Sequence, residues 1–233
     1  MKMKLNDEIV SLLKQAGCGI VGFADLRCLS NEARANFDYG ILMALPFSKE
    51  ALLENNNGLP QKYYEEHEPM TRHLAQLRKI TAEFLIGKGY DALMETPASV
   101  FSRETLRSLL PQKTVATLSG IGWIGKCAML VTHEVGSALR LTVVLTSAPL
   151  DCGTPVTKSK CPTDCTICVD ICPGKAPLGG LWEVGVDRDE FFNAHACYTA
   201  ARNRAKELLG VDEARCGLCI SNCPFTKNGL GYE

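Results

Sequence analysis

The chain has 233 residues, of which 46% are apolar, and its 25 basic residues nearly balance 26 acidic ones, which predicts one or two domains with a hydrophobic core. Nucleic-acid binders usually carry an excess of basic residues. This chain has no such excess, so we expect no nucleic-acid partner. No apolar run approaches the ~20 residues that span a bilayer, and no secretory signal begins the chain, so we expect no membrane partner and a reducing, cytoplasmic location.

The first half of the chain alternates helical and strand patterns. Apolar residues spaced by three and four predict a helix over residues 4–16. Short apolar runs predict strands at residues 19–24 and 41–45, and the turn-forming residues 54–60 predict a loop. A long helix follows, in which we expect Pro69 near the first turn, with His67 and His73 as surface or capping residues.

Shorter elements fill the rest. We expect a strand at residues 90–94, a short helix at 102–110, a clear strand at 139–146 and a helix at 189–209. Residues 147–160 are rich in Pro, Gly, Ser and Thr, which is typical of a linker. We therefore predict a domain boundary near residue 150.

Twelve cysteines are present, and seven of them lie in two related runs. The first run reads C-P-T-D-C-T-I-C-V-D-I-C-P and the second reads C-G-L-C-I-S-N-C-P, so both contain C-x-x-C-x-x-x-C-P. Ferredoxins with two clusters use closely related runs, in which the last cysteine of each run binds the other cluster. The proline that follows directs the chain away from the site.

Two [4Fe–4S] clusters need eight thiolates, and the segment between the runs offers Cys197 as the eighth. Crossed ligation would divide the thiolates into two sets. The first set is Cys161, Cys165, Cys168 and Cys223, and the second set is Cys172, Cys197, Cys216 and Cys219. Cys161 is separated from Cys165 by three residues instead of the usual two. Cys152 is therefore the alternative ligand in place of Cys161.

The cysteines could also bind zinc or form disulfide bonds. Paired C-x-x-C units also bind structural zinc, although zinc ribbons have shorter separations than Cys168 to Cys216 and need no third cysteine in each run. A disulfide framework is disfavoured because twelve cysteines in 233 residues fall below the ~8–10% density of disulfide scaffolds. We treat Cys18 and Cys28 as small apolar residues.

A glycine-rich loop, S-G-I-G-W-I-G-K, occupies residues 119–126. Its glycines match the dinucleotide fingerprint G-x-G-x-x-G, but that fingerprint requires a following helix and an acidic residue ~20 positions later. Here a strand pattern follows, and the chain offers Arg140 instead of a carboxylate. We therefore expect no dinucleotide site. The glycines instead indicate that the backbone closely approaches another group at this loop. They are Gly120, Gly122 and Gly125.

The other residues of this loop suit a large planar cofactor with polar edges. Trp123 would supply a flat apolar wall and Lys126 a cation. A tight turn packed under a neighbouring sheet is the structural alternative. Cys127 follows directly, and we expect a buried structural thiol there, with a place facing the cofactor as the alternative.

An N-terminal α/β part, the loop G-I-G-W-I-G-K, a β-segment and the two cysteine runs together resemble the epoxyqueuosine reductase family. They are more distantly similar to the corrinoid reductive dehalogenases. The likeness covers about residues 115–228, and earlier residues match only in the order of elements. The loop and the cysteine runs are specific in combination, whereas either alone would be ordinary.

This resemblance implies an α+β fold. Residues 1–150 would form a reduced, nitroreductase-like α/β domain that binds cobalamin without a histidine lower ligand. Residues 151–233 would form a ferredoxin-like domain with two [4Fe–4S] clusters, one of them beside the corrin. The other would take electrons from a small donor of the ferredoxin or flavodoxin type. Gly122, Trp123, Gly125 and Lys126 fall on the family's loop near the corrin, and Cys197 falls on its lone cysteine between the runs.

Two departures from the family matter. The family carries an acidic proton donor upstream of the glycine-rich loop, but the corresponding stretch L-R-S-L-L-P-Q-K has no carboxylate, and Glu104 is the nearest. The family's basic helical-repeat extension has no counterpart here, so we expect no action on tRNA. The sequence thus predicts an iron–sulfur oxidoreductase that delivers electrons to a bound cofactor or substrate. The alternative is an electron-transfer or activating protein for a partner enzyme.

Overall fold

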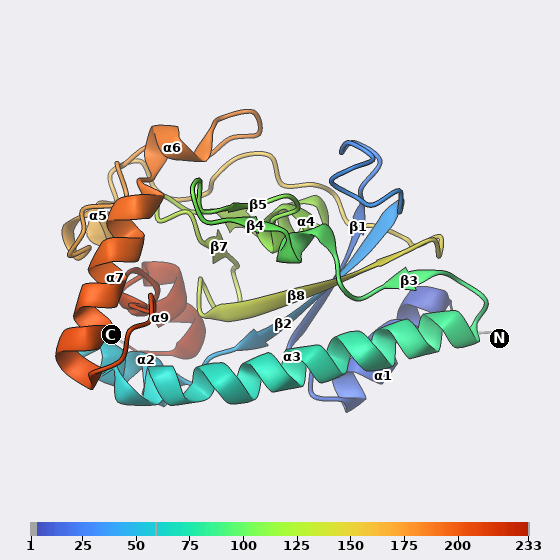
Figure 1. The fold of residues 1–233 in the computed structure, drawn as a ribbon, viewed down its shortest axis with the longest axis horizontal. Helices are drawn as coiled ribbons and strands as arrows, with labels where there is room; N and C mark the ends of the chain where they lie inside the picture. The colour runs from blue at the N-terminus through green and yellow to red at the C-terminus, as the bar shows by residue number, and fades with distance from the viewer. Residues whose placement is uncertain (1–3, 59, 233) are drawn as a thin grey trace. The chain divides into compact units, whose positions relative to one another are not determined.

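The computed structural model describes residues 4–58 and 60–232 and combines helices with strands (Figure 1). The chain divides into two compact units, and each is assembled from three segments. The first, here called the sheet unit, contains the chain up to Leu45 with Met70–Ile121 and Arg140–Val156. The second, here called the cysteine unit, contains Pro46–Pro69, Gly122–Leu139 and the chain from Thr157 onward.

The two units do not correspond to the two halves of the chain. The last passage between them, at Val156 and Thr157, lies close to the boundary expected near residue 150. However, the segments Pro46–Pro69 and Gly122–Leu139 belong to the cysteine unit. The assignment of separate functions to residues 1–150 and 151–233 stays a prediction.

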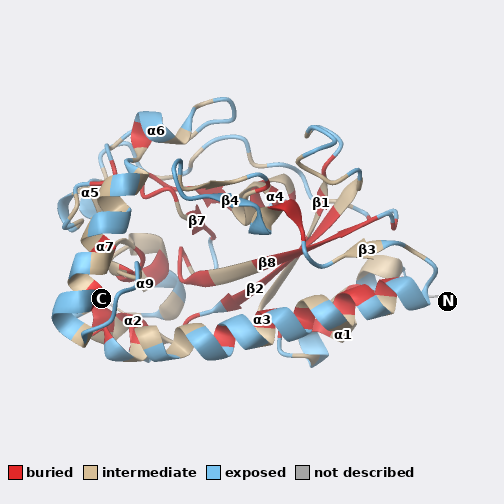
Figure 2. Ribbon diagram, in the orientation of Figure 1, coloured by how far each residue is buried: buried red, intermediate tan, exposed pale blue. Residues whose placement is uncertain are grey.

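A four-stranded sheet forms the centre of the sheet unit. Its strand order is β1 (Ile20–Asp25), β2 (Tyr39–Pro46), β8 (Leu139–Thr146) and β3 (Ala92–Leu93). β1 is antiparallel to β2, and β3 is antiparallel to β8. Most of β2 and β8 is buried (Figure 2), because central strands covered on both faces need continuous apolar residues. The four predicted strands are confirmed.

Helices cover the two faces of this sheet (Figure 1). α1 (Leu5–Gln15) and the later half of α3 (Gln61–Gly87) lie on one face, and α4 (Gln112–Leu118) lies on the other. The close approach of α4 depends on Gly22, because a Cβ there would stand 2.6 Å from the Ser119 Oγ. α4 itself was not predicted from the sequence.

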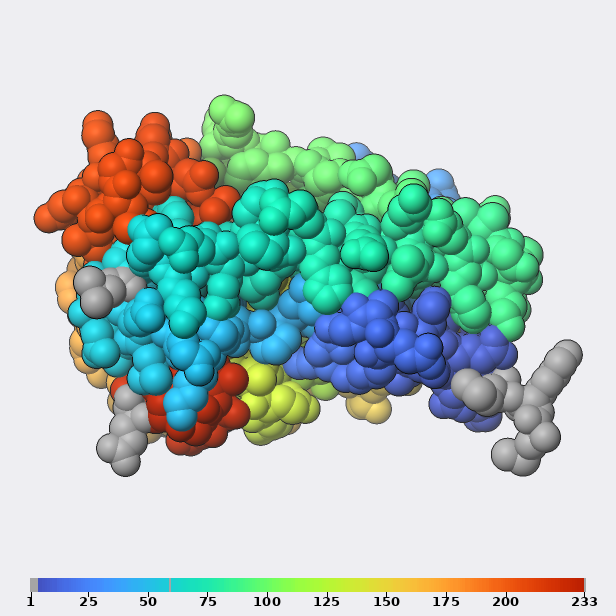
Figure 3. Space-filling view, turned by 90° about the horizontal axis from the view of Figure 1, so that it is seen from below, coloured from blue at the N-terminus to red at the C-terminus, as the bar shows by residue number. Residues whose placement is uncertain are grey.

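α1 lies alongside the last turns of α3 (Figure 3). The Nε2 of His73 is hydrogen-bonded to the carbonyl oxygen of Ala16 at 2.7 Å. Lys88 forms an ion pair with Glu8. His73 thus serves as the capping residue that the sequence indicated, since it satisfies a carbonyl at the end of α1.

The start of α3 differs from the prediction. α3 begins at Gln61, so Pro69 lies inside the helix instead of near its first turn. Because proline has no N–H, the Glu65 carbonyl loses its helical partner there. The expected loop at residues 54–60 is also shorter, because α2 (Lys49–Asn56) extends into it, with the Ser48 Oγ accepting a hydrogen bond from the Ala51 N–H.

The short helix expected at residues 102–110 is wrong. The chain forms the 3₁₀ turn η1 (Pro97–Ser99) and then a hairpin of β4 (Phe101–Ser102) and β5 (Arg107–Ser108). Residues 100–105 are exposed, so a helix here would bury no apolar face. Isolated helices of this length are unstable in water.

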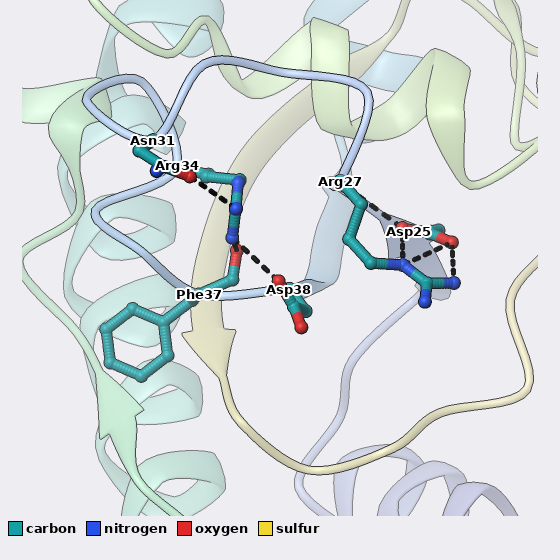
Figure 4. A network of polar contacts seen from close by, with 6 residues as sticks. All are labelled: Asp25, Arg27, Asn31, Arg34, Phe37 and Asp38. Carbon is teal, nitrogen blue, oxygen red and sulfur yellow. Dashed lines mark hydrogen bonds and ion pairs between the residues drawn. The ribbon is translucent and has the colours of Figure 1, made fainter.

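Two ion pairs brace the loop between β1 and β2 (Figure 4). The Arg27 guanidinium contacts Asp25 at 2.5 Å, and the Arg34 Nη1 contacts the Asp38 Oδ1 at 2.7 Å. The hydrogen bonds from Arg27 lower the pKa of Asp25. Because solvent screens exposed ion pairs, we expect the pair between Asp25 and Arg27 to contribute little to stability.

Short elements joined by turns make up most of the cysteine unit. A hairpin of β6 (Trp123–Ile124) and β7 (Leu130–Val131) carries the glycine-rich loop. The helix expected at residues 189–209 is interrupted at Phe192 and Asn193. The remaining helices are α5 (Ile167–Asp170), α6 (Arg188–Phe191), α7 (Ala194–Leu209), α8 (Leu218–Ser221) and α9 (Pro224–Leu230). Across the described part of the chain, no helix combines the length and the apolar character needed to cross a bilayer.

Candidate functional site

A cavity of about 600 Å³, here called the first cysteine cavity, lies within the cysteine unit. Its walls come from the β6–β7 turn, the first cysteine run and the start of α9. All four cysteines that the sequence assigned to one cluster line it: Cys161, Cys165, Cys168 and Cys223. Two residue stretches that are more than fifty positions apart therefore meet at this cavity, as crossed ligation requires.

A smaller cavity of about 260 Å³, here called the second cysteine cavity, lies in the same unit. Its walls come from α7, α8 and the end of the first cysteine run. It is lined by the four cysteines assigned to the other cluster: Cys172, Cys197, Cys216 and Cys219. Cys219 lines both cavities.

The turn chemistry of the second run shapes the walls of both cavities. Gly217 precedes α8 with a φ of +71°, a left-handed conformation that favours glycine. A Cβ at this position would also stand 2.7 Å from the Tyr63 ring. Cys223 is the N-cap of α9, and Pro224 occupies its first turn, where proline costs no hydrogen bond.

Cys197 reaches the second cavity from the first turn of α7. The Oδ1 of Asn193 caps this helix by accepting a hydrogen bond from the Ala196 N–H at 3.0 Å. The close packing of α7 depends on Gly174, because a Cβ there would stand 2.6 Å from the Ala196 carbonyl oxygen. The helix cap and this contact together fix the position of Cys197.

Cys161 and Cys152 occupy different surroundings. Cys161 lines the first cavity, whereas Cys152 belongs to the sheet unit, where its thiol donates to the Leu150 carbonyl oxygen at 3.4 Å. Burial, followed by the charge of Asp25, raises the pKa of Cys152 to about 11. The choice of Cys161 over Cys152 as a cluster ligand stays a prediction.

Lys126 is engaged by the first cysteine run. Its side chain is 3% exposed, and its Nζ donates hydrogen bonds to the carbonyl oxygens of Thr163 and Cys165, both at 2.9 Å. A buried ammonium needs such acceptors because desolvation of the charge is costly. Lys126 thus ties the glycine-rich loop to the loop that carries Cys161 and Cys165, which the sequence did not indicate.

Trp123 and the loop glycines also pack against protein. Trp123 has no exposed surface, and its ring lies 4.9 Å from the rings of His133 and Phe225. A Cβ on Gly122 would stand 2.2 Å from the Val131 carbonyl oxygen, so the hairpin requires glycine there. Gly120 lies in the sheet unit, where a Cβ would stand 2.7 Å from the Thr154 carbonyl oxygen. Their role in cofactor binding stays a prediction.

Two residues of the cavity walls were not assigned to the site from the sequence. Cys127 lines the first cavity and is 4% exposed, so the expected burial is confirmed. Its adjacency to the glycine-rich loop was the available signal. His67, expected at the surface or at a cap, lines the second cavity and packs 4.8 Å from Tyr63.

Burial keeps several thiols protonated without a metal. It raises the pKa of Cys216 and of Cys223. The pKa of Cys168 is raised first by a hydrogen bond with Cys127 and second by burial. Metal binding must therefore displace protons from these thiols. The Cys172 sulfur already accepts a hydrogen bond from the Ala176 N–H at 3.4 Å.

The cysteines surround the cavities instead of converging on single points. Within residues 4–58 and 60–232, no three His, Cys, Asp or Glu side chains lie close enough together to hold one metal ion.

Curated relatives carry a common name. An epoxyqueuosine reductase of Atelocyanobacterium thalassa is 34% identical over 127 residues, which are 51% of this chain and 38% of the relative. An epoxyqueuosine reductase of Lactococcus garvieae is 30% identical over 172 residues, which are 69% of this chain and 42% of the relative. The chain therefore spans about two fifths of the length of these relatives. No family model matches it.

Solved structures share the fold. The structure of epoxyqueuosine reductase from Streptococcus thermophilus matches 97% of this chain and 67% of its own, with a TM-score of 0.60 and 19% identity. A catabolic reductive dehalogenase matches 96% of this chain and 32% of its own, with a TM-score of 0.64 and 16% identity. The resemblance to the epoxyqueuosine reductases, and more distantly to the dehalogenases, is confirmed. The mixed helix and sheet fold is confirmed with it, while the nitroreductase-like and ferredoxin-like assignments stay predictions.

One comparison corrects an expectation. An epoxyqueuosine reductase solved with a modified tRNA stem loop matches 97% of this chain and 66% of its own, with a TM-score of 0.59 and 18% identity. The expectation of no nucleic-acid partner, drawn from balanced charge and a missing extension, conflicts with this finding and is withdrawn. Net charge sums over the whole chain, whereas RNA recognition depends on local shape and contacts.

Proposed function

We propose that this protein is an iron–sulfur oxidoreductase that holds two [4Fe–4S] clusters and supplies electrons to a bound cofactor or substrate. The first cluster would be held by Cys161, Cys165, Cys168 and Cys223, and the second by Cys172, Cys197, Cys216 and Cys219. The curated relatives are named reductases, which supports a redox activity. A small donor of the ferredoxin or flavodoxin type is the proposed electron source.

The observation that carries this proposal is that each proposed set of four cysteines lines one cavity, although Cys219 also borders the first cavity. Each cavity combines thiols from both ends of the cysteine unit, with one member crossing over from the other run. A mononuclear zinc site needs no such crossing. When bound, such clusters accept and release single electrons at potentials set by hydrogen bonds and burial.

The surrounding residues would prepare both sites for a charged cluster. The Lys126 ammonium holds two carbonyl oxygens of the first cysteine run, which keeps that loop in shape and leaves a positive charge at the cavity wall. In the second cavity, Tyr63 and His67 provide an aromatic wall. Apolar walls limit access of water and thereby affect the potential of a bound metal.

Cobalamin is the proposed acceptor by resemblance alone. The five loop residues expected to hold it are engaged by the protein itself: Gly120, Gly122, Trp123, Gly125 and Lys126. They therefore add no independent support for a corrin. Corrin content of anaerobically purified protein, measured in an acid extract, tests this part of the proposal separately from the clusters.

A second candidate function is electron transfer to a partner enzyme without a substrate of its own. The stretch from Thr105 to Leu118 contains no carboxylate, so the position where the resembled family carries its proton donor has none. Retention of both clusters without corrin, combined with electron transfer to an added acceptor protein, would favour this candidate.

The test is an iron and sulfide assay on the whole chain after anaerobic reconstitution. We expect about eight iron and eight sulfide per wild-type chain, since two cubanes require them. Cys165→Ala and Cys197→Ala remove one proposed ligand from the first and the second cavity respectively. Each variant should retain about four iron, with loss of the electron paramagnetic resonance signal of one reduced cluster.

Two cysteines outside the proposed sets provide controls. Cys152→Ala, at the alternative ligand, and Cys18→Ala, at a buried thiol of the sheet unit, should both keep the full iron content. Wild-type protein that binds zinc alone, or that stays free of iron while folded, would overturn the proposal. Loss of iron from Cys152→Ala but not from Cys161→Ala would reassign the first ligand.

A further inference from the structure

The turn between β6 and β7 borders both cysteine cavities. Gly125, Lys126 and Cys127 line the first cavity, and Met129 lines the second. The turn is tight, because the Gly125 N–H donates to the Met129 carbonyl oxygen at 2.9 Å and Ala128 has a φ of +57°. Four of the five positions from Gly125 to Met129 therefore line one or the other of the two cavities.

Cys127 has an unusual place in this turn. Its thiol is buried and lines the first cavity together with Cys168 and Cys219. Cys168 belongs to the first proposed ligand set and Cys219 to the second. Cys127 is thus a ninth thiol that shares a cavity wall with one proposed ligand of each cluster, and it is not needed to complete either set of four.

The chemistry available to this thiol follows from its single proton. When Cys168 and Cys219 bind iron as thiolates they can only accept hydrogen bonds, so the one S–H of Cys127 serves one of them at a time. A hydrogen bond to a ligand sulfur stabilises the more negative, reduced cluster and raises its reduction potential.

We propose that Cys127 is a positioning residue that does not bind iron and whose thiol donates a hydrogen bond to a cluster ligand, thereby raising the reduction potential of that cluster. This inference rests on the proposed two-cluster function. The tight turn and the attachment of the adjacent Lys126 to the carbonyl oxygens of Thr163 and Cys165 hold the thiol in place.

The test is a redox titration of the reconstituted whole chain, monitored by electron paramagnetic resonance. Cys127→Ala removes the donor while filling part of the space. We expect a shift of one cluster midpoint potential to a more negative value, with iron content unchanged at about eight per chain. Cys127→Ser retains a donor and should restore the potential towards the wild-type value. Cys18→Ala, which removes a buried thiol bonded to the backbone carbonyls of Ile20 and Ala44, should shift neither potential.

Three results would overturn the inference. Unchanged midpoint potentials in Cys127→Ala would leave the thiol a packing role only. Equal shifts in Cys127→Ser and Cys127→Ala would show that the donor is irrelevant. Loss of about four iron from either variant would make Cys127 a ligand. Wild-type protein without iron would instead defeat the proposed function, so the two failures are distinguishable.

Discussion

The sheet unit and the cysteine unit are stabilised by different means. In the sheet unit, side chains without exposed surface pack between a sheet and its helices, as with Ile9, Leu13, Ile41, Leu42 and Leu77. In the cysteine unit, the elements are mostly one or two turns long and surround two cavities lined by thiols. Short helices bury little apolar surface, so their stability must come from elsewhere.

We therefore expect the sheet unit to be stabilised by its apolar core and the cysteine unit by the two proposed clusters. A cluster bound by four cysteines joins segments that would otherwise separate, and its binding free energy then becomes folding free energy. The two units should therefore respond differently to metal removal and to side-chain truncation.

Removal of iron should produce the largest effect. If anaerobic chelation empties both proposed sites, we expect the cysteine unit to lose most of its amide protection while β1, β2 and β8 keep theirs. The reason is that the sheet keeps its apolar core when the metal leaves. Hydrogen exchange with mass spectrometry measures both regions in one sample, and equal loss of protection in both units would contradict the comparison.

Truncation in the apolar core should act in the opposite way. Leu77 has no exposed surface, so Leu77→Ala should lower the free energy of unfolding by about 2–5 kcal/mol. Denaturant unfolding measures this loss, and iron content should not change. Ile86→Ala on the same helix is the matched control, because Ile86 is 59% exposed and its truncation should cost below ~0.5 kcal/mol.

Removal of the Lys126 ammonium should destabilise the cysteine unit directly. Lys126→Met keeps much of the side-chain volume but removes two charge-assisted hydrogen bonds to the carbonyl oxygens of Thr163 and Cys165, at a cost of about 1–3 kcal/mol. The decrease should appear in denaturant unfolding of reconstituted protein. Lys158→Met removes an exposed ammonium paired with Glu183 and should cost at most ~1 kcal/mol. A similar loss in both variants would argue against a special role for Lys126.

Removal of the α7 cap should have a smaller effect. Asn193→Ala takes away the acceptor for the Ala196 N–H, which should cost about 1 kcal/mol. Because Cys197 follows one residue later, the second cluster should also load more slowly during reconstitution. Asn193→Asp keeps an acceptor and should behave as wild type in both measurements.

The least disruptive test involves no substitution and compares the alkylation rate of the Cys152 thiol in folded and in unfolded protein. The Cys152 pKa is raised from 9.0 to about 11, so its protonated form favours the folded state. That contribution is fully present below pH 9 and is lost as pH rises through 11. Since the thiolate is the reactive form, alkylation of Cys152 at pH 9 should be ~50-fold slower in folded than in unfolded protein. Mass spectrometry of the labelled chain measures both rates, and equal rates would contradict the burial of this thiol.

Local patterns in the sequence predicted much of this molecule. The strands at residues 20–25, 39–46 and 139–146 follow from short apolar runs, whereas the sorting of eight cysteines into two ligand sets stays a prediction. The helix expected at residues 102–110 was wrong because its exposed residues had no partner to pack against. The interruption of the later helix at Phe192 was also missed.

By itself, the sequence determined which thiols share a loop and which segments form strands, because both depend on residues a few positions apart. Only the tertiary structure decided where the glycine-rich loop lies, that Lys126 binds the carbonyl oxygens of the first cysteine run, and that Cys127 lines the same cavity as Cys168 and Cys219. These residues are separated by about forty to ninety positions in the sequence. Such pairs form only in the folded chain. A cation or thiol that burial removes from water needs a hydrogen-bond acceptor, and the fold determines which acceptor lies within reach.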